Sequence, residues 1–228
     1  MKQQMRFLVA GLVLVLASTA MAGLAQAATC SADVCPPGSN PFGMTYGEWS
    51  ARWWQWAVQT PKQNNPLLDT TGAKCAVGQS GPVWFLAGTL GSGSVTRTCT
   101  VPAGKALFFP VVNAFCANNP GESATYNDEL ACAQAAMAGA TGATEIDGTP
   151  VQPAGHLEQR YLFASPSFSL NLPPDNVFNA RPGIYSPAAA DGIYLMLAPL
   201  GSGQHVVHFK GSAAAASVEA TYNLTVAG

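Results

Sequence analysis

The chain has 228 residues, a formal net charge of −2 and only 10% charged residues, together with 23 glycines and 17 prolines. Globular proteins carry about 25% charged residues on average, so this surface must be built largely from neutral side chains and backbone groups. The sequence contains no basic block that would follow a phosphate backbone, which argues against nucleic acid as a partner.

Residues 1–27 have the pattern of a cleaved signal peptide. Lys2 and Arg6 precede an apolar run over residues 7–22, and A-Q-A ending at Ala27 supplies the small-x-small cleavage site. The apolar run is shorter than the ~20 residues of a spanning helix. We therefore predict export and cleavage, a secreted or periplasmic protein, and no membrane span after cleavage.

All six cysteines follow the predicted cleavage site, and their number is even. In a chain bound for an oxidising compartment this predicts three disulfides. Because no C-x-x-C or neighbouring histidine spacing occurs, we predict neither a metal site nor a cofactor. Of the possible pairings we expect the one that closes the shortest loops, which is Cys30–Cys35, Cys75–Cys99 and Cys116–Cys132.

Residues 28–62 are expected to form a disulfide-tied tail and a tryptophan-rich helix, packed on a main domain over residues 63–228. Thr45 followed three residues later by Glu48 predicts a capping box at the helix start. Pro61 disfavours helical geometry at the residue before it, so the helix should end there.

Four tryptophans lie in this predicted helix. Trp49, Trp53 and Trp56 share one face at 3.6 residues per turn, whereas Trp54 lies on another flank. Trp54 is either an exposed platform on which a sugar ring stacks or a further packing residue. Burial of an indole is strongly favourable, so we favour packing.

Residues 83–89, 94–101 and 106–112 read as three strands. The short turn sequences between them predict an antiparallel meander. Pro110 cannot donate a ladder hydrogen bond, so the third strand should lie at an edge or bulge there. Arg97 falls on the apolar face of the middle strand. Its burial requires a carboxylate or several carbonyl partners, and we favour a structural ion pair over a ligand clamp.

A second helix is predicted over residues 127–138, with Asp128 and Glu129 in its first turn. The dipeptide Asp147-Gly148 predicts a tight hairpin. A long surface loop is expected between residues 173 and 187. The remaining predicted strands cover residues 157–164, 168–172, 193–197, 205–209 and 218–226.

Two helices and about nine or ten short strands predict a mainly β protein, with a two-layer antiparallel sandwich of jelly-roll or Ig-like type. The segments W-W-Q-W, G-P-V-W-F-L-A-G, V-P-A-G-K-A-L-F-F-P and D-G-I-Y-L-M-L-A-P-L-G-S-G-Q-H point the same way. They resemble a group of exported bacterial proteins that have an N-terminal WWxW helix and a β-rich body. The resemblance implies export and this fold, and it implies no activity.

The strongest polar cluster is His156, Glu158 and Arg160, which strand alternation would place on one face. We favour a solvated outer face, with a catalytic cleft as the alternative. A glycosidase would need a second carboxylate about 5–9.5 Å from Glu158. We predict that none of the loop acids comes within that range; these are Asp69, Asp175 and Asp191.

His205 shares a strand face with Val207 and Phe209, so we expect a hydrogen-bonded histidine at the edge of the core. His208 points the other way, and the two histidines cannot form a metal site alone.

No nucleophile elbow, zinc-protease or nucleotide-binding motif occurs in the sequence. This favours a non-catalytic ligand- or glycan-binding domain of the cell envelope or medium. An envelope glycan or protein would be the partner, and Trp54, Arg97 and His205 are the candidate binding residues. The alternatives are an envelope glycan hydrolase or lyase that uses His156, Glu158 and Arg160, and a structural or assembly subunit.

Overall fold

The computed structural model describes Cys30 and residues 33–228. The predicted signal peptide lies outside these residues. Within the described part of the chain, no helix is both long enough and apolar enough to cross a membrane.

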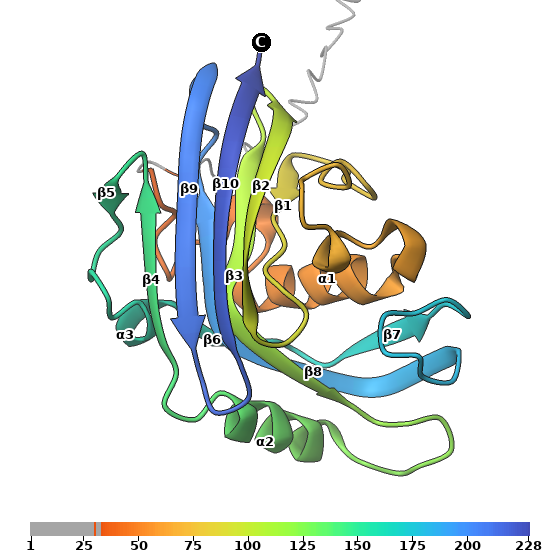
Figure 1. Ribbon diagram of the computed structural model, residues 1–228. Coiled ribbons are helices and arrows are strands. Elements are labelled where there is room, and N and C mark those ends of the chain that lie inside the picture. The colour runs from red at the N-terminus through yellow and green to blue at the C-terminus, as the bar shows by residue number, and fades with distance from the viewer. Residues whose placement is uncertain (1–29, 31–32) are drawn as a thin grey trace, which may run out of the picture.

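The protein is mainly β, as predicted, and its strands form two five-stranded sheets (Figure 1). The first sheet has the order β1 (Val83–Phe85), β3 (Ala106–Ala117), β8 (Gly183–Leu197), β6 (Leu162–Ala164), with β7 (Phe168–Leu172) also paired to β8. The second sheet has the order β2 (Gly93–Pro102), β10 (Ser217–Ala227), β9 (Gly203–Ser212), β4 (Thr141–Ile146), β5 (Thr149–Pro150).

Both sheets are mixed, so the purely antiparallel arrangement was wrong. β1 runs parallel to β3, and β2 runs parallel to β10. The predicted meander fails because β2 leaves its sequence neighbours and joins the other sheet. All 10 residues of β2 pair with β10, so its backbone groups are satisfied in the second sheet.

Two adjacent phenylalanines in β3 show how the layers are stacked. The ring of Phe108 lies 6.1 Å from that of Tyr46 in α1 (Tyr46–Gln59), and the ring of Phe109 lies 4.8 Å from that of Phe209 in β9. Neighbouring side chains of a strand point to opposite faces. The first sheet is therefore covered by α1 on one face and by the second sheet on the other, and β3 and β8 bend around α1 (Figure 1).

The predicted start of the tryptophan-rich helix is confirmed, and the second helix begins one residue earlier than predicted. The Thr45 side chain accepts from the Glu48 N–H at 3.2 Å, and the Thr45 N–H donates to Glu48 Oε2 at 2.7 Å, which completes the capping box of α1. A second box, between Thr125 and Asp128, begins α2 (Tyr126–Ala136), with Glu129 also in its first turn. Short 3-10 helices cover Pro41–Gly43, Lys62–Asn64 and Pro66–Leu68.

The hairpin is also confirmed. β4 and β5 pair in antiparallel fashion around Asp147 and Gly148, whose φ angles of 51° and 77° are those that a two-residue hairpin turn requires. The register of β3 shifts between Pro110 and Val112, which is the predicted bulge.

Two local predictions were wrong. Residues 158–161 are not a strand but a single helical turn, α3 (Glu158–Tyr161), because Leu157 and Tyr161, four residues apart, both turn inward and are buried. The expected loop before residue 187 is shorter than predicted, because β8 already begins at Gly183 and pairs with β7.

All three disulfides follow the predicted pairing: Cys30–Cys35, Cys75–Cys99 and Cys116–Cys132. None of these described cysteines is free.

Candidate functional site

A groove of about 730 Å³ opens beside the tip of the β4–β5 hairpin. Its walls come from five separate parts of the chain: the hairpin, the end of α3, the loop over residues 198–201, the start of β9 and the segment over residues 33–36. Its polar lining residues include Asp33, Asp147, Arg160, Tyr161 and His205, and its apolar lining includes Ile146, Pro150, Val151 and Leu200. We call this the His205 groove. It brings together two residues singled out from the sequence, Arg160 and His205.

His205 is held at both ring nitrogens. Nδ1 lies 2.8 Å from Oδ2 of Asp147, and Nε2 lies 2.9 Å from the carbonyl oxygen of Gly201. An ionised carboxylate and a carbonyl oxygen both only accept, so this arrangement suits a ring that donates from both nitrogens, which is the imidazolium form. The hydrogen bond to Asp147 is the main cause of a raised His205 pKa. With 18% of its side chain exposed, His205 is the hydrogen-bonded core-edge histidine that the sequence predicted.

Asp147 joins the hairpin turn to β9. Its Oδ1 accepts a hydrogen bond of 2.7 Å from the Val206 N–H, while Oδ2 contacts His205. The backbone bond from Val206, followed by the bond from His205, lowers the pKa of Asp147. The sequence predicted the turn and the histidine separately. It did not predict their contact, because the two residues lie 58 positions apart.

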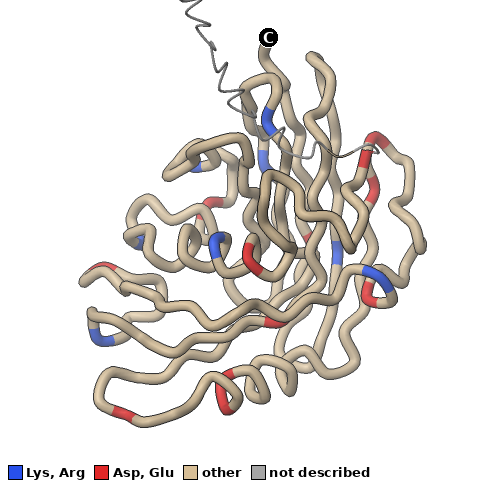
Figure 2. Tube along the Cα trace, turned by 180° about the vertical axis from the view of Figure 1, so that it is seen from behind, with Lys and Arg blue, Asp and Glu red and all other residues tan. Residues whose placement is uncertain are grey.

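Arg160 is an exposed cation at this groove. Its guanidinium carbon lies 5.9 Å from the centre of the Tyr161 ring, and none of the salt bridges among the described residues includes it. Lys and Arg are few and are scattered over the trace (Figure 2). An arginine without a carboxylate partner at a groove has its donors available for an anionic or hydroxyl-bearing ligand.

The other two members of the predicted cluster do not line the groove. Nδ1 of His156 lies 3.2 Å from Oε1 of Glu158, and the two side chains are 63% and 20% exposed. The prediction that these two residues share one strand face with Arg160 was wrong, because residues 158–161 form a helical turn and not a strand.

The loop acids considered as partners of Glu158 do not line the groove either. Asp69 accepts hydrogen bonds from the backbone N–H groups of Thr71 and Lys74, and Asp175 accepts one from Gln63. Asp191 lies in β8, where burial raises its pKa.

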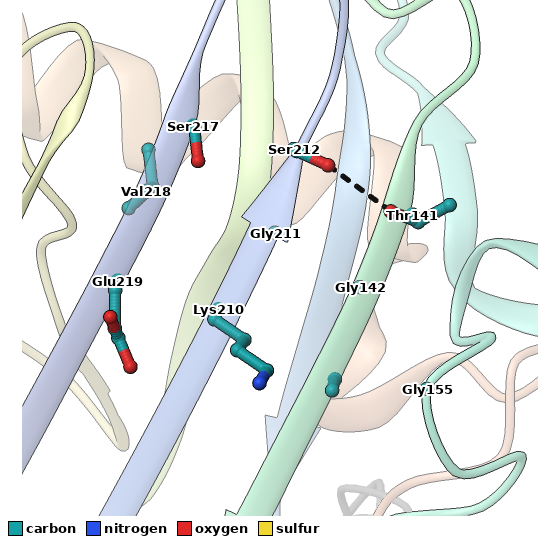
Figure 3. A pocket seen from close by; sticks show the side chains of 10 residues that line it. Thr141, Gly142, Gly155, Lys210, Gly211, Ser212, Ser217, Val218 and Glu219 are labelled. Carbon is teal, nitrogen blue, oxygen red and sulfur yellow. Dashed lines mark hydrogen bonds between the residues drawn. The ribbon is translucent and has the colours of Figure 1, made fainter.

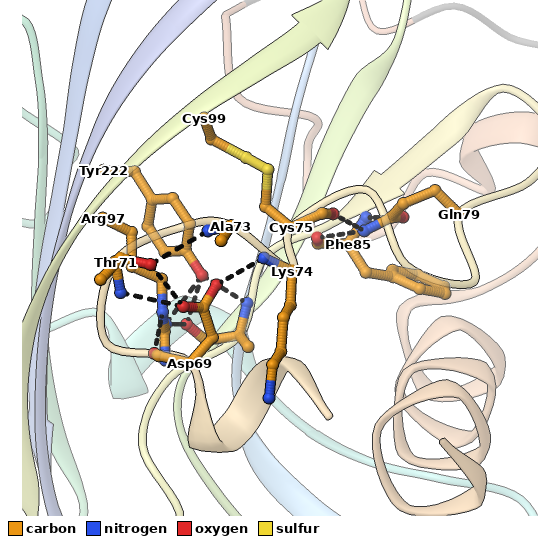
Figure 4. The surroundings of a disulfide bond; sticks show 11 residues. Asp69, Thr71, Ala73, Lys74, Cys75, Gln79, Phe85, Arg97, Cys99 and Tyr222 are labelled. Carbon is orange, nitrogen blue, oxygen red and sulfur yellow. Dashed lines mark hydrogen bonds between the residues drawn. A yellow bond between two sulfur atoms is a disulfide. The ribbon is translucent and has the colours of Figure 1, made fainter. Parts of the chain in front are cut away.

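Arg97 is 1% exposed, and its side chain is fully occupied by the protein (Figure 4). Its five N–H groups reach five acceptors, which is the full donor capacity of a guanidinium. The acceptors are the carbonyl oxygens of Pro66, Asp69, Ala87 and Gly88 and the hydroxyl oxygen of Tyr222. The favoured ion pair was therefore wrong, since carbonyl oxygens take the place of a carboxylate. The ligand clamp was also wrong, because no donor is left for a ligand.

Trp54 is 7% exposed, and its ring packs 4.4 Å from that of Phe115 and 5.0 Å from that of Trp53. The packing interpretation is confirmed and the exposed sugar platform was wrong. Helical periodicity misplaced this residue because α1 is covered on more than one flank. Trp56, which was predicted to share the buried face, is only half-buried.

A second hollow lies on the outer side of the second sheet, with Lys210 and Glu219 at opposite register positions (Figure 3). The hydroxyl oxygens of Thr141 and Ser212 lie 3.2 Å apart across it. With a volume of about 280 Å³ it is much smaller than the His205 groove, so we take the groove as the candidate site.

Comparison of the chain with protein-family models, with curated proteins and with solved structures gave no match.

Proposed function

We propose that this is an exported, non-catalytic binding protein of the cell envelope or medium, and that its ligand lies in the His205 groove. The observation that carries the proposal is the presence of Arg160, without a carboxylate partner, at a groove of about 730 Å³. Sites for small ligands usually have volumes of about 300–1,000 Å³. The three disulfides support an oxidising, extracellular or periplasmic environment.

The lining of the groove favours a glycan as the ligand. Ile146, Pro150 and Leu200 offer apolar surface to the C–H groups of a sugar ring, and Arg160 offers donors to its hydroxyl or carboxylate oxygens. Apolar surface for contact, together with polar groups that fix the orientation, is the usual composition of a small-ligand site, and the groove offers both. A β-sandwich built from the two sheets would present this groove at one end, and its jelly-roll or Ig-like type stays a prediction.

The hydrolase or lyase alternative receives less support. It would use His156, Glu158 and Arg160 together, but of these three only Arg160 lines the groove. Asp147, which does line it, has a lowered pKa, whereas a general acid at neutral pH needs a raised one. A structural or assembly subunit is the remaining alternative, and the groove is the feature that argues against it.

The test is isothermal titration of the disulfide-bonded mature protein with a panel of envelope oligosaccharides. Arg160→Gln should weaken binding about tenfold, because it removes hydrogen bonds to a charged group. Arg181→Gln, a change at an exposed arginine outside the groove, and Glu158→Gln should leave the affinity unchanged. The proposal fails if no oligosaccharide binds or if Arg160→Gln has no effect. Hydrolysis products that disappear in Glu158→Gln would establish the enzyme instead.

A further inference from the structure

The exposed side of α1 carries two hollows, of about 480 and 380 Å³, that share Arg52 and Gln55. They therefore adjoin one another along the helix. None of their lining residues belongs to the His205 groove. We call this surface the Trp56 face, because Trp56 is the half-buried indole that lines it.

The indole of Trp56 is held in a fixed orientation. Its Nε1 donates a hydrogen bond of 2.8 Å to the carbonyl oxygen of Val77, and the ring of Phe85 packs 5.4 Å away. Gly78, with a φ of +65°, lies against the ring, and a Cβ added there would come within 3.2 Å of Trp56 Cδ1. A ligand that packs against this ring does not have to order it first, which lowers the cost of binding.

The Trp56 face carries one cation, Arg52, and one acid, Glu48. Arg52 is exposed, and no salt bridge within the described part of the chain includes it. Glu48 is the one acid that lines either hollow, and its Oε2 already accepts hydrogen bonds from the Thr45 N–H and hydroxyl at 2.7 and 2.9 Å. Those bonds, the backbone one first, lower the pKa of Glu48 and hold its Oε2 at the helix cap.

Neutral hydrogen-bonding groups complete the surface. Gln55 and Gln59 lie on successive turns of α1 and line the larger hollow with Trp56. Gln55 donates from Nε2 to the carbonyl oxygen of Ser169 at 3.1 Å, which directs its amide toward β7. Amides and a guanidinium beside a half-buried aromatic ring match the hydroxyls, carboxylate and C–H face of a sugar acid.

We propose that the Trp56 face is a binding site for an anionic glycan. The ring of a uronic acid residue packs against Trp56, and its carboxylate accepts hydrogen bonds from Arg52. The second hollow continues the surface for a neighbouring sugar residue. This site is separate from the His205 groove and does not depend on the function proposed for that groove.

The test uses the disulfide-bonded mature protein and short oligomers of galacturonate, glucuronate and mannuronate, with neutral galactose and glucose oligomers of equal length. Affinity is measured by isothermal titration, and the indole environment by tryptophan fluorescence. We expect at least one uronate oligomer to bind at least tenfold more tightly than the neutral oligomers and to change the fluorescence.

Substitutions assign the site. Arg52→Gln should weaken uronate binding about tenfold, through loss of a charge-assisted hydrogen bond. Trp56→Phe, which keeps an aromatic ring and is checked for folding by circular dichroism, should also weaken it. Arg181→Gln, at an exposed arginine outside both surfaces, is the control that should not. Arg160→Gln reports on the His205 groove alone, so uronate binding that is lost in Arg160→Gln and kept in Arg52→Gln would place the ligand in the groove and overturn this inference without touching the proposed function.

Three outcomes would overturn the inference: no uronate oligomer binds, neutral oligomers bind equally well, or Arg52→Gln binds like the unchanged protein. A short glutamate peptide is included as a further probe. If it binds as tightly as the best uronate oligomer, the face recognises carboxylates in general and the glycan assignment is wrong.

Discussion

Tyr222 and Arg97 occupy the same register position on the parallel strands β10 and β2, and the Tyr222 hydroxyl oxygen accepts a hydrogen bond of 2.8 Å from Nη1 of Arg97. The same hydroxyl accepts from the Ala87 N–H at 3.0 Å and donates to the Ala87 carbonyl oxygen at 2.8 Å. Burial raises the pKa of Tyr222, so the hydroxyl stays protonated. The Tyr222 hydroxyl thus stabilises the buried guanidinium of Arg97 and also fixes the backbone at Ala87, just after β1.

We expect Tyr222→Phe to lower the free energy of unfolding by about 1–3 kcal/mol. The ring volume is kept, but a guanidinium N–H and the Ala87 N–H lose their acceptor inside the core. Urea denaturation measures the change. Tyr185→Phe is the matched control, because that hydroxyl makes a single neutral bond, to the Arg181 carbonyl oxygen. Equal losses in the two variants would contradict a special role for Tyr222.

Trp54→Ala should destabilise the protein about as much as Trp53→Ala, by roughly 3–5 kcal/mol, because both indoles are buried. Trp56→Ala should cost less, since that ring is half-buried. Chemical denaturation of the three variants gives the order. If Trp54→Ala is as stable as the unchanged protein, Trp54 is not a core residue and the exposed-platform interpretation is the correct one.

Removal of the Cys75–Cys99 disulfide with the double substitution Cys75→Ser and Cys99→Ser should cost about 3 kcal/mol. This bond closes a loop with a sequence separation of 24. The control is the same change at Cys30 and Cys35, where the separation is 5 and the expected cost is about 1–2 kcal/mol lower.

Thermal unfolding without reductant compares the two disulfide variants. Titration of the denatured, unreduced parent protein should find no reactive thiol, and two or more thiols would reject the three-disulfide assignment.

The His205–Asp147 pair should make stability depend on pH. The pKa of His205 is raised in the folded protein, so its contribution is complete below its unfolded pKa of about 6.5 and is lost as the pH rises through the folded value. The pKa of Asp147 is lowered, so its contribution is present above about 3.8 and is lost as the pH falls through its folded value. The pair is thus most stabilising in mildly acidic solution.

The stability lost in His205→Gln should therefore be greatest near pH 5–6, at about 1 kcal/mol given the partial exposure of the pair, and should shrink toward pH 9. Asp147→Asn removes the same contact from the other side and should show the same trend. Denaturant titrations across this pH range provide the measurement. A loss that is constant, or that grows with pH, would show that the imidazolium assignment is incorrect.

Features that depend on a few neighbouring residues were predictable from the sequence. The capping box of Thr45 and Glu48 spans three residues, and the turn at Asp147 and Gly148 needs two. The cysteine pairing follows the shortest loops, and the alternation along β10 requires no knowledge of its partners. For the cap and the turn, the energy that selects the conformation comes from within the segment itself.

Only the tertiary structure decided the rest. β2 pairs with β10 rather than with its sequence neighbours, and Arg97 and Tyr222 meet although they are 125 positions apart. The His205 groove is assembled from five segments, and the burial of Trp54 depends on Phe115 in β3. These features are stabilised by contacts between segments that are distant in the sequence. Local periodicity contains no information on such contacts, so neither proposed binding surface could be predicted from the sequence alone.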